Sequence, residues 1–362
     1  MSTKFYSLKI ASVEALTSES VLLNFDVTAD LKNEFQYHQG QHLTLRAEIN
    51  GEDIRRSYSL CSSVDDQILQ VAVKRIPDGI FSNYANESLS AGMTLDVMAP
   101  QGHFYTELDK NNAKSYLFVA TGSGITPVIS NILSILHNEP QSKVTLIYGN
   151  KTSSLMMFRE KLSFIKNEYI DRFNWVNCFT KEENDAEILN GRISTDKLVA
   201  MESLKIIDSL SFDDVFLCGA ESMIEELNQF FQGRNIADEN IHYELFFAGD
   251  SADEVSKKQQ ARAAKFTGKV SEVSVKVSGR KTIMSLPMDG DNILDAAMAN
   301  GADLPFSCKG GVCATCKAKL VKGQVDMDRN HSLTEEEVSQ GMILTCQAHP
   351  LSEEVEIDFD FS

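Results

Sequence analysis

The chain has 362 residues, 43% of them apolar, and a formal net charge of -18. This length is too great for one ordinary core, so we expect two or three domains. The negative charge argues against nucleic acid as a partner, because phosphate backbones are bound by excess Lys and Arg. The sequence shows no run of about 18 apolar residues and no apolar segment behind a basic start. We therefore expect no membrane span, no signal peptide and a cytoplasmic protein.

The first part of the chain, residues 1–106, is predicted to be an antiparallel β-barrel. Its segments at 20–27, 41–49 and 68–76 are rich in branched residues and are separated by Gly, Asp, Asn and Ser clusters. Short strands at this spacing are typical of an antiparallel barrel or sandwich. A proline and a glycine in APQGHFYTEL (99–108) then interrupt regular structure and mark the end of the domain.

Two stretches of this domain carry residues that suit a cofactor. In RRSYSLCSS, Arg56 and Tyr58 would point to one side of a strand, because side chains alternate. An arginine suits a phosphate, a tyrosine ring can lie against an aromatic cofactor, and the small hydroxyl of Ser59 can reach a ring nitrogen. A surface arginine and a half-buried tyrosine are the alternative interpretation. In VAVKRIPDGIFSNY, Gly79 and Ser82 open a predicted helix whose amides can take a pyrophosphate.

Residues 110–248 are predicted to form an α/β domain. Compact apolar strands alternate with segments whose apolar residues are three and four apart. This alternation is typical of a parallel sheet with helices on both faces. The predicted strands are 115–120, 143–150, 173–179 and 214–220, and the predicted helices are 127–138 and 221–235.

The turn after the first of these strands suits a phosphate group. In VATGSGITPV, Gly122 and Gly124 let the backbone approach a phosphate at the positive end of a helix that Pro127 opens. The full G-x-G-x-x-G of the dinucleotide fingerprint is absent, so this turn by itself is only weak support for a Rossmann site.

The last part of the chain is predicted to be a small α+β domain behind a linker. Residues 249–266 have almost no large apolar side chain and carry mixed charge, so they are predicted to be the linker. Residues 267–362 show an alternating strand at 269–279, a short capped helix at 291–301 and a final strand at 353–361. We expect a β-grasp-like fold around the cysteines.

Four of the seven cysteines have a spacing that is typical of a [2Fe–2S] cluster. Cys308, Cys313 and Cys316 are related as C-x4-C-x2-C, and Cys346 follows. Plant-type ferredoxins hold two bridged irons with this spacing. A structural zinc site would more often show two separate C-x2-C pairs or histidine ligands. In a reducing compartment, clustered cysteines are more often metal ligands or catalytic thiols than disulfides. Two adjacent glycines in the loop permit a close backbone wrap.

These motifs together resemble the ferredoxin-NADP reductase family joined to a plant-type ferredoxin, as in the reductase components of bacterial multicomponent oxygenases. The resemblance rests on R-x-Y-S, T-G-x-G-I-T-P, the C-G of FLCGAES and the four cysteines. Many members of the family have Pro where this chain has Ala220. The resemblance implies that NADPH, with NADH as the alternative, gives a hydride to FAD. Single electrons would then pass to the cluster and on to an oxygenase partner.

The resemblance also implies which residues take part. Ser59 and Cys218 would lie at the reacting groups, although Cys218 also fits a small buried residue at a strand end, and Phe246 also fits a core position. The residues expected to bind FAD or the nicotinamide nucleotide are Arg56, Tyr58, Ser59, Leu60, Val73, Lys74, Gly79, Phe81, Ser82, Thr121, Gly122, Gly124, Thr126, Pro127, Cys218, Gly219 and Phe246. The expected iron ligands are Cys308, Cys313, Cys316 and Cys346.

Several alternatives stay open at this stage. Reductases of other aromatic or steroid oxygenases and hydroxylases would share these motifs. A non-catalytic iron–sulfur carrier is a further alternative, against which the intact R-x-Y-S and T-G-x-G-I-T-P turns speak. Lys151 and Arg159 could meet the 2′-phosphate of NADPH or be solvated charges. The lysines in and after the cysteine loop could dock an oxygenase or be ordinary solvated side chains; they are Lys309, Lys317, Lys319 and Lys322.

Overall fold

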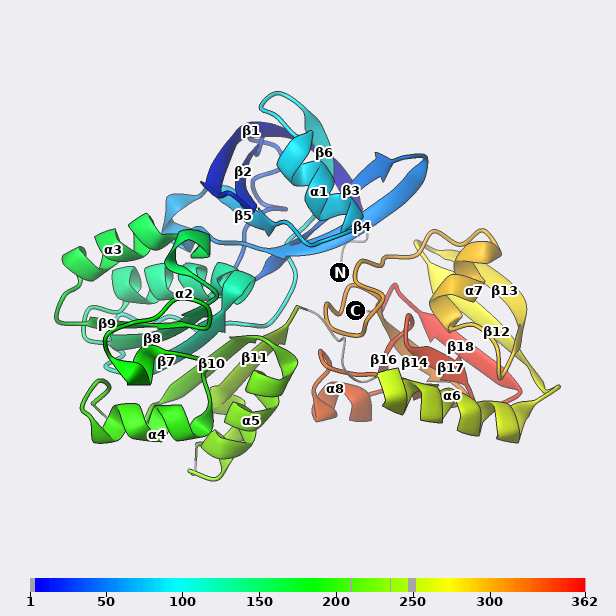
Figure 1. Ribbon diagram of the computed structural model, residues 1–362. Coiled ribbons are helices and arrows are strands. Elements are labelled where there is room, and N and C mark those ends of the chain that lie inside the picture. The colour runs from blue at the N-terminus through cyan, green and yellow to red at the C-terminus, as the bar shows by residue number, and fades with distance from the viewer. Residues whose placement is uncertain (1–3, 209, 235, 247–251, 362) are drawn as a thin grey trace. The chain divides into compact units, whose positions relative to one another are not determined.

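The structure is a computed structural model that describes residues 4–208, 210–234, 236–246 and 252–361, without the side chains of 252–255. These residues divide into two compact units, of which the first spans Phe5–Phe246 and the second contains the described residues from 252 onward. The first unit holds an antiparallel and a parallel sheet (Figure 1). Within the described ranges, no helix combines the length and the apolarity that crossing a membrane requires.

The first sheet is antiparallel, as the pattern of short branched segments predicts, and it has six strands. The predicted strands at 20–27, 41–49 and 68–76 are β2, β3 and β5. An isolated bridge between Leu60 and Val71 brings the end of β4 to β5, so the two edge strands meet. Helix α1 (Ile80–Glu87) packs against the sheet. Across the sheet the strands are β4 (Glu52–Ser59), β3 (His42–Ile49), β6 (Thr94–Met98), β1 (Phe5–Thr17), β2 (Ser20–Asp26) and β5 (Leu69–Lys74).

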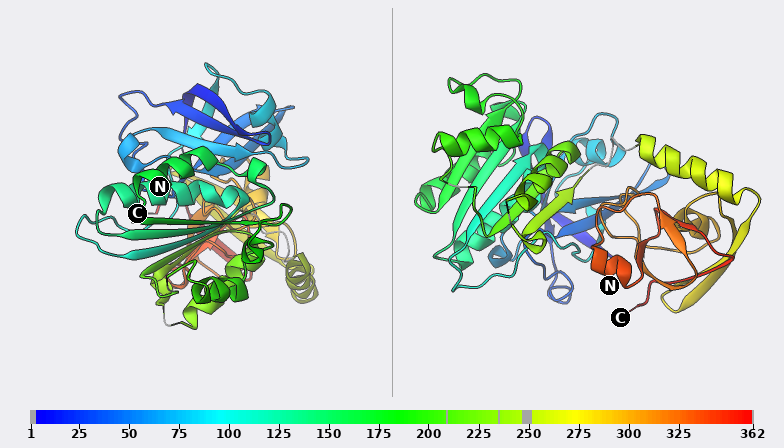
Figure 2. Two further views of the ribbon diagram at one scale, coloured as in Figure 1. Left: turned by 60° about the vertical axis from the view of Figure 1, so that its left-hand side comes forward. Right: turned by 90° about the horizontal axis from the view of Figure 1, so that it is seen from below.

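The parallel sheet has five strands with helices on both faces (Figures 1 and 2). Four strands and two helices match the predicted segments. The edge strand β11 was not predicted, because only Ile241 and Leu245 of its five residues are buried and the segment shows no run of apolar residues. Across the sheet the strands are β11 (Ile241–Leu245), β10 (Asp214–Gly219), β7 (Ser115–Thr121), β8 (Lys143–Asn150) and β9 (Phe173–Phe179). Helices α2 (Ile125–Asn138) and α3 (Arg159–Glu168) cover one face, and α4 (Thr195–Ser203) and α5 (Glu221–Gln232) cover the other.

The parallel arrangement gathers the functional turns at one edge of the sheet. The carboxyl ends of parallel strands meet there, and in such sheets ligands bind at that edge. β7 ends at Thr121 and continues into the short helix η2 (Gly122–Gly124) and then α2, while β10 ends at Gly219 beside it. Helix α2 also contacts the barrel, since Asn131 Nδ2 donates a hydrogen bond to the backbone oxygen of Phe104 at 2.9 Å. The glycine turn is thus held next to the barrel.

The second unit is a small α+β domain, as predicted. Its helix α7 begins where expected, because Asn292 is the N-cap and its side chain accepts a hydrogen bond from the amide of Asp295 at 2.9 Å. β12 pairs in parallel with β18, and all other strand pairs of the domain are antiparallel. The main sheet has the order β13 (Arg280–Pro287), β12 (Val270–Val277), β18 (Glu354–Asp358), β14 (Lys317–Lys322) and β16 (Met342–Leu344). A small sheet pairs β15 (Val325–Met327) with β17 (Ala348–Pro350), and the helices are α7 (Ile293–Ala299) and α8 (Glu335–Ser339).

The segment predicted to be a linker, 249–266, contains the helix α6 (Ala252–Phe266), while residues 249–251 lie outside the described residues. The sequence KKQQARAAK within it consists of residues with high helix propensity, which a prediction based on missing apolar side chains overlooks. The domain limits at 106, 110 and 248 stay predictions.

Candidate functional site

Strand β4 presents the R-x-Y-S residues at the barrel surface. Arg56 is exposed and Tyr58 is half-buried, whereas Ser59 is buried. Because Arg56 and Tyr58 are two residues apart on a strand, they point to the same side. The ring centroids of Tyr58 and Phe81 lie 5.6 Å apart. Burial raises the pKa of Tyr58 above its usual range, so its ring stays neutral. This side of β4 offers a cation next to an aromatic surface, which suits a flavin and its phosphates.

The turn before α1 is tight and leaves amides free for an anionic group. The hydroxyl of Ser82 accepts a hydrogen bond from the amide of Ile76 at 3.1 Å and donates one to the carbonyl of Gly79 at 3.2 Å. A Cβ at Gly79, the N-cap, would lie 2.5 Å from that hydroxyl, so a larger residue would displace the hydroxyl that holds the turn. The helix start can then take a phosphate. The side chains of Leu60 and Val73 are fully buried in the barrel core, so only their backbone can contact a cofactor.

The turns after β7 and β10 are in direct contact. Thr121 Oγ1 accepts a hydrogen bond from the amide of Ala220 at 3.1 Å. A Cβ at Gly219 would clash with Thr121 Oγ1, and a Cβ at Gly124 would clash with the carbonyl of Cys218. The sequence places these residues about one hundred positions apart, and the parallel register of β7 and β10 brings them together. The structure therefore brings Thr121, Gly124, Cys218 and Gly219 into contact.

A lysine of the barrel lies beside the glycine turn at Gly122. The hydroxyl of Tyr148 donates a hydrogen bond to the carbonyl of Gly122 at 2.9 Å, and a Cβ at Gly122 would lie 3.9 Å from Nζ of Lys74. Burial lowers the pKa of Lys74, and repulsion from the ammonium of Lys151 acts in the same direction. Lys74 of the barrel thus lies beside the turn, and Lys151 of the α/β domain is close enough to act on the charge of Lys74. This arrangement suits the phosphates of a nucleotide.

Glu244 joins the predicted catalytic pair and is the residue that sequence reasoning missed. Ser59 Oγ donates a hydrogen bond to Glu244 Oε1 at 3.3 Å, and Glu244 is the register partner of Cys218 in the adjacent strand. Burial raises the pKa of Glu244 to about 8, while the Ser59 hydrogen bond acts in the opposite direction. Glu244 Oε2 is buried without a hydrogen-bond partner among the described residues. A carboxyl group that is protonated near neutral pH can hold or transfer a proton.

The remaining residues that were predicted to bind the cofactors are buried or partly buried. Burial raises the pKa of Cys218, with the carboxylate of Glu244 as a second cause, so this thiol stays neutral. Thr126 and Pro127 are buried in the first turn of α2. Phe246 is partly buried and packs against the apolar core of the α/β domain. Both the core role and the cofactor role of Cys218 and Phe246 fit these positions, and their contacts with a cofactor stay predictions.

The four predicted iron ligands lie together as two pairs of thiols. Cys308 is hydrogen-bonded to Cys313, and Cys316 is hydrogen-bonded to Cys346. The hydrogen bond from Cys313 and those from backbone amides lower the pKa of Cys308 to about 6, whereas the same bond and burial raise the pKa of Cys313. The amide of Gly310 donates to Cys308 Sγ at 3.3 Å. Amides directed at the sulfur stabilise a thiolate, which is the form that binds iron.

This arrangement fits a [2Fe–2S] cluster. A [2Fe–2S] cluster would take two thiolates on each iron, and the loop together with Cys346 supplies two pairs. Throughout the described ranges, no three His, Cys, Asp or Glu side chains converge as ligands of a single ion. Gly311 has a φ of +79°, and a Cβ there would lie 3.1 Å from the carbonyl of Arg329 and 3.2 Å from Cγ of Gln347. Only glycine permits this close wrap of the backbone.

The lysines near the cluster are engaged inside their own domain. Lys309 Nζ pairs with Asp295 at 2.6 Å, and Lys317 Nζ pairs with Glu337 at 2.9 Å. The side chain of Lys317 is only 7% exposed and therefore cannot face a partner protein. Lys319 and Lys322 contact the backbone oxygen of Gln340 and the carboxylate of Glu354. Lys317 is therefore no longer a candidate for docking an oxygenase, and the other three lysines have partners within their own domain.

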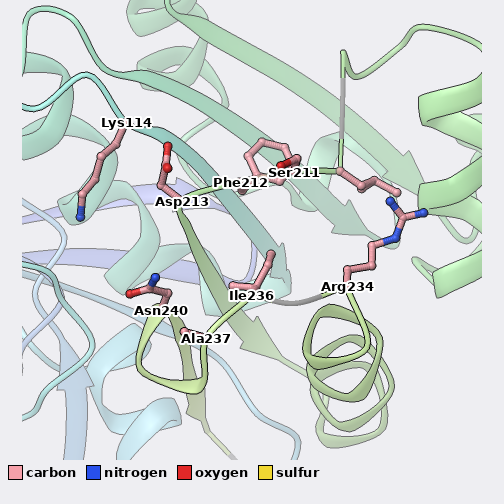
Figure 3. A pocket seen from close by; sticks show the side chains of 9 residues that line it. Lys114, Ser211, Phe212, Asp213, Arg234, Ile236, Ala237 and Asn240 are labelled. Carbon is pink, nitrogen blue, oxygen red and sulfur yellow. The ribbon is translucent and has the colours of Figure 1, made fainter.

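A separate pocket of about 480 Å³ lies at the opposite edge of the parallel sheet, where β7, β10 and β11 begin (Figure 3). Both cations of its lining have partners, since Lys114 pairs with Asp214 at 2.9 Å and Arg234 lies 3.7 Å from Glu202. The pocket is thus remote from the glycine turns at the carboxyl ends of the strands and is not the nucleotide site. Its lining consists of Lys114, Leu210, Ser211, Phe212, Asp213, Arg234, Ile236, Ala237 and Asn240.

Three protein families match successive parts of the chain. An oxidoreductase FAD-binding domain matches residues 7–105, an oxidoreductase NAD-binding domain matches 118–229, and a 2Fe-2S iron-sulfur cluster binding domain matches 275–351. These matches follow the order of the barrel, the parallel sheet and the cysteine domain. The cofactors are therefore FAD, a nicotinamide nucleotide and a [2Fe–2S] cluster.

Relatives match the chain over nearly their full length. A component of the 1,2-phenylacetyl-CoA epoxidase of Escherichia coli (strain K12) is 41% identical over 358 residues, which are 99% of this chain and 98% of that protein. The ferredoxin reductase component of the 3-ketosteroid-9-alpha-monooxygenase of Rhodococcus rhodochrous is 30% identical over 361 residues, 97% of this chain and 96% of that protein. Among solved structures, phthalate dioxygenase reductase has a TM-score of 0.59 at 23% identity and covers 98% of both chains. It confirms the multidomain fold.

Proposed function

The chain belongs to the family of NAD(P)H-dependent reductases that combine an FAD-binding barrel, a NAD-binding domain and a [2Fe–2S] ferredoxin domain, and from this we propose that it supplies electrons to a phenylacetyl-CoA epoxidase. The observation that carries the proposal is the identity of 41% over nearly the full length of both proteins, against 30% for the steroid monooxygenase reductase. Relatives of both kinds are components of oxygenase systems, so the partner is an oxygenase component in either case.

The site residues support the order NADPH, FAD, cluster and oxygenase. When bound, FAD accepts a hydride and passes electrons on singly, and the cluster carries one electron at a time. Arg56 and Tyr58 of β4 hold and orient the flavin side. The turn at Gly122, with Lys74 beside it, binds phosphate. Glu244, hydrogen-bonded to Ser59, holds a proton at a buried carboxyl next to the proposed reacting groups.

NADPH is the proposed electron source, with NADH as the alternative. Lys151 follows β8 directly and acts on the charge of Lys74, so it lies near the phosphate-binding turn. Arg159 is exposed at the start of α3. Cations at this place suit the additional 2′-phosphate of NADPH. The proposal also places the protein in the cytoplasm, where thiols stay reduced and pyridine nucleotides supply electrons.

The partner is tested by reconstitution with purified oxygenase components. The protein is mixed with the oxygenase of a phenylacetyl-CoA epoxidase or with that of a 3-ketosteroid-9-alpha-monooxygenase, and product formation is measured together with NADPH consumption. We expect coupled turnover with the first oxygenase and at least about tenfold less with the second, a difference of about 1.4 kcal/mol in productive docking. Equal coupling to both, or better coupling to the steroid enzyme, would reject the epoxidase partner and leave the reductase activity intact.

A further inference from the structure

Helix α6 docks on the iron–sulfur domain mainly through charged side chains (Figure 1). Among residues 256–266, only Arg262 and Phe266 are buried, and Arg262 is 5% exposed. A surface helix usually docks by an apolar stripe. Here a guanidinium group lies at the centre of the buried face instead. Such a contact fixes one position of the helix, because an ion pair tolerates less sliding than an apolar surface.

The partner of Arg262 is a buried carboxylate. Arg262 Nη2 lies 2.7 Å from Asp328 Oδ1, and His349 Nε2 lies 3.2 Å from Asp328 Oδ2. The side chain of Asp328 is 7% exposed. Lys258, one turn before Arg262, donates from Nζ to the carbonyl of Asp328 at 3.0 Å. Buried ion pairs cost much of their Coulomb energy in desolvation, so their main product is a fixed geometry rather than stability.

Asp328 is connected on one side to the fourth cysteine. It follows β15, which pairs with β17, and β17 begins two residues after Cys346. The amide of Asp328 donates a hydrogen bond to the carbonyl of Gln347 at 2.9 Å. The side-chain amide of Gln347 in turn lies 3.7 Å from Cys346 Sγ and donates to the carbonyl of Lys309, in the cysteine loop, at 2.8 Å. A shift of Asp328 would therefore move an amide that points at a cluster sulfur.

On its other side Asp328 leads into the segment that covers the cysteine loop. The amide of His331 donates to the carbonyl of Gly311 at 3.1 Å, and the hydroxyl of Ser332 donates to the same carbonyl at 3.3 Å. The carbonyl of Arg329 packs against Gly311. The residues before and after Asp328 thus hold both parts of the ligand set, the loop with three cysteines and the later strand with the fourth.

We propose that Arg262 is a positioning residue for the [2Fe–2S] cluster. By holding Asp328, it fixes the small β15–β17 sheet, and that sheet sets the separation of the cysteine loop from Cys346 and directs the Gln347 amide at the sulfur. Hydrogen bonds to cluster sulfurs and the access of solvent are what tune the reduction potential of such a cluster. The inference concerns the ferredoxin domain alone and does not depend on which oxygenase is the partner.

The test uses the full-length holoprotein with Arg262→Met, and Lys257→Met as the matched control on the exposed side of α6. Three quantities are measured: the reduction potential of the cluster, the electron paramagnetic resonance spectrum of its reduced form, and the rate of iron release to a chelator. For Arg262→Met we expect a changed potential and spectrum and iron release about tenfold faster. Ferricyanide reduction by NADPH, which needs only the first unit, should stay within about twofold of the parent. Lys257→Met should match the parent in every measurement.

Because Arg262→Met leaves a buried carboxylate without its cation, the domain could unfold for that reason alone. The double variant Arg262→Met with Asp328→Leu removes both charges and should keep the cluster domain folded. If the ion pair positions the sheet, the double variant melts near the parent temperature but still shows the changed potential and the fast iron release. Parent-like potential and iron release in the folded single variant, or in the double variant, would overturn the proposal.

Discussion

The hydroxyl of Ser59 donates a hydrogen bond to the carboxyl group of Glu244 at 3.3 Å, although 185 positions separate them in the chain. Ser59 ends the barrel strand β4, and Glu244 lies in the edge strand β11 of the parallel sheet. The bond therefore joins the flavin half and the nicotinamide half of the first unit at the proposed reacting groups.

The ionisation of Glu244 should make the stability of the first unit depend on pH. Its pKa is about 8 in the folded protein against 4.5 for an ordinary glutamate, chiefly because of burial. Stabilisation by the bound proton is therefore complete below about pH 4.5 and is lost as pH rises towards 8, by up to about 1.4 kcal/mol per pH unit. Glu244→Gln cannot ionise, so its unfolding free energy should fall less over this range. Urea unfolding of the FAD-bound protein at several pH values measures the difference. Equal slopes for Glu244→Gln and for the exposed control Glu225→Gln would contradict the prediction.

The close approach of Gly124 to Cys218 predicts a selective loss in Gly124→Ala. The added Cβ would clash with the backbone carbonyl of Cys218 and push the two turns apart. We expect the rate of flavin reduction by NADPH to fall by about 100-fold, because a displacement of about 1 Å at the reacting groups costs that much, while FAD stays bound. Stopped-flow absorbance at the flavin band gives the rate. Gly233→Ala is the control, because its Cβ meets only ordinary contacts, and it should leave the rate of flavin reduction unchanged. A parent-like rate in Gly124→Ala would contradict the prediction, because the two turns could then separate without loss of hydride transfer.

Replacing any one of Cys308, Cys313, Cys316 and Cys346 by serine should remove the signal of the reduced [2Fe–2S] cluster, because each thiol belongs to one of the two pairs. Iron content and electron paramagnetic resonance check this, and flavin absorbance should persist. The buried cysteines Cys61, Cys178 and Cys218 lie in the first unit, so their replacement by alanine should leave iron content unchanged. Iron loss in any of these three would refute the ligand assignment.

A fragment that ends at Phe246 should fold and bind FAD, since Phe5–Phe246 is a compact unit with its own cores. It should reduce ferricyanide with NADPH at a rate close to that of the full chain, because hydride transfer needs only this unit. Reduction of cytochrome c should drop by about tenfold or more, as the one-electron route through the cluster is missing. If the fragment reduces cytochrome c as fast as the full chain does, the electrons do not pass through the cluster.

The cation at Lys151 should favour NADPH over NADH. Lys151→Ala is expected to lower kcat/KM for NADPH by about tenfold, the effect of losing about 1.4 kcal/mol, and to leave that for NADH unchanged. Steady-state rates with both nucleotides, using ferricyanide as acceptor, measure the ratio. Lys143→Ala, an exposed lysine at the start of β8 and therefore at the opposite edge of the sheet, is the control. An equal loss with both nucleotides would assign Lys151 to the shared phosphates instead of the 2′-phosphate.

The sequence by itself determined the order of the domains and the identity of the cluster. The spacing of Cys308, Cys313 and Cys316 is typical of a [2Fe–2S] cluster. It can be recognised in the sequence because these three ligands lie on one short loop. The same holds for the glycine turns and the strand patterns, since backbone conformation and side-chain alternation are properties of neighbouring residues. The helix α6 was missed because its residues favour a helix by propensity alone, without an apolar stripe.

Only the tertiary structure decided which distant polar groups meet. Glu244 lies in a short edge strand without a recognisable motif, and its link to Ser59 exists only because the parallel register and the packing of α2 on the barrel bring them together. Arg262 and Asp328 form a buried pair across 66 positions, although either side chain alone would be read as an ordinary surface charge. Burial decides the chemistry of such groups, and burial is set by the whole fold rather than by the residues beside them.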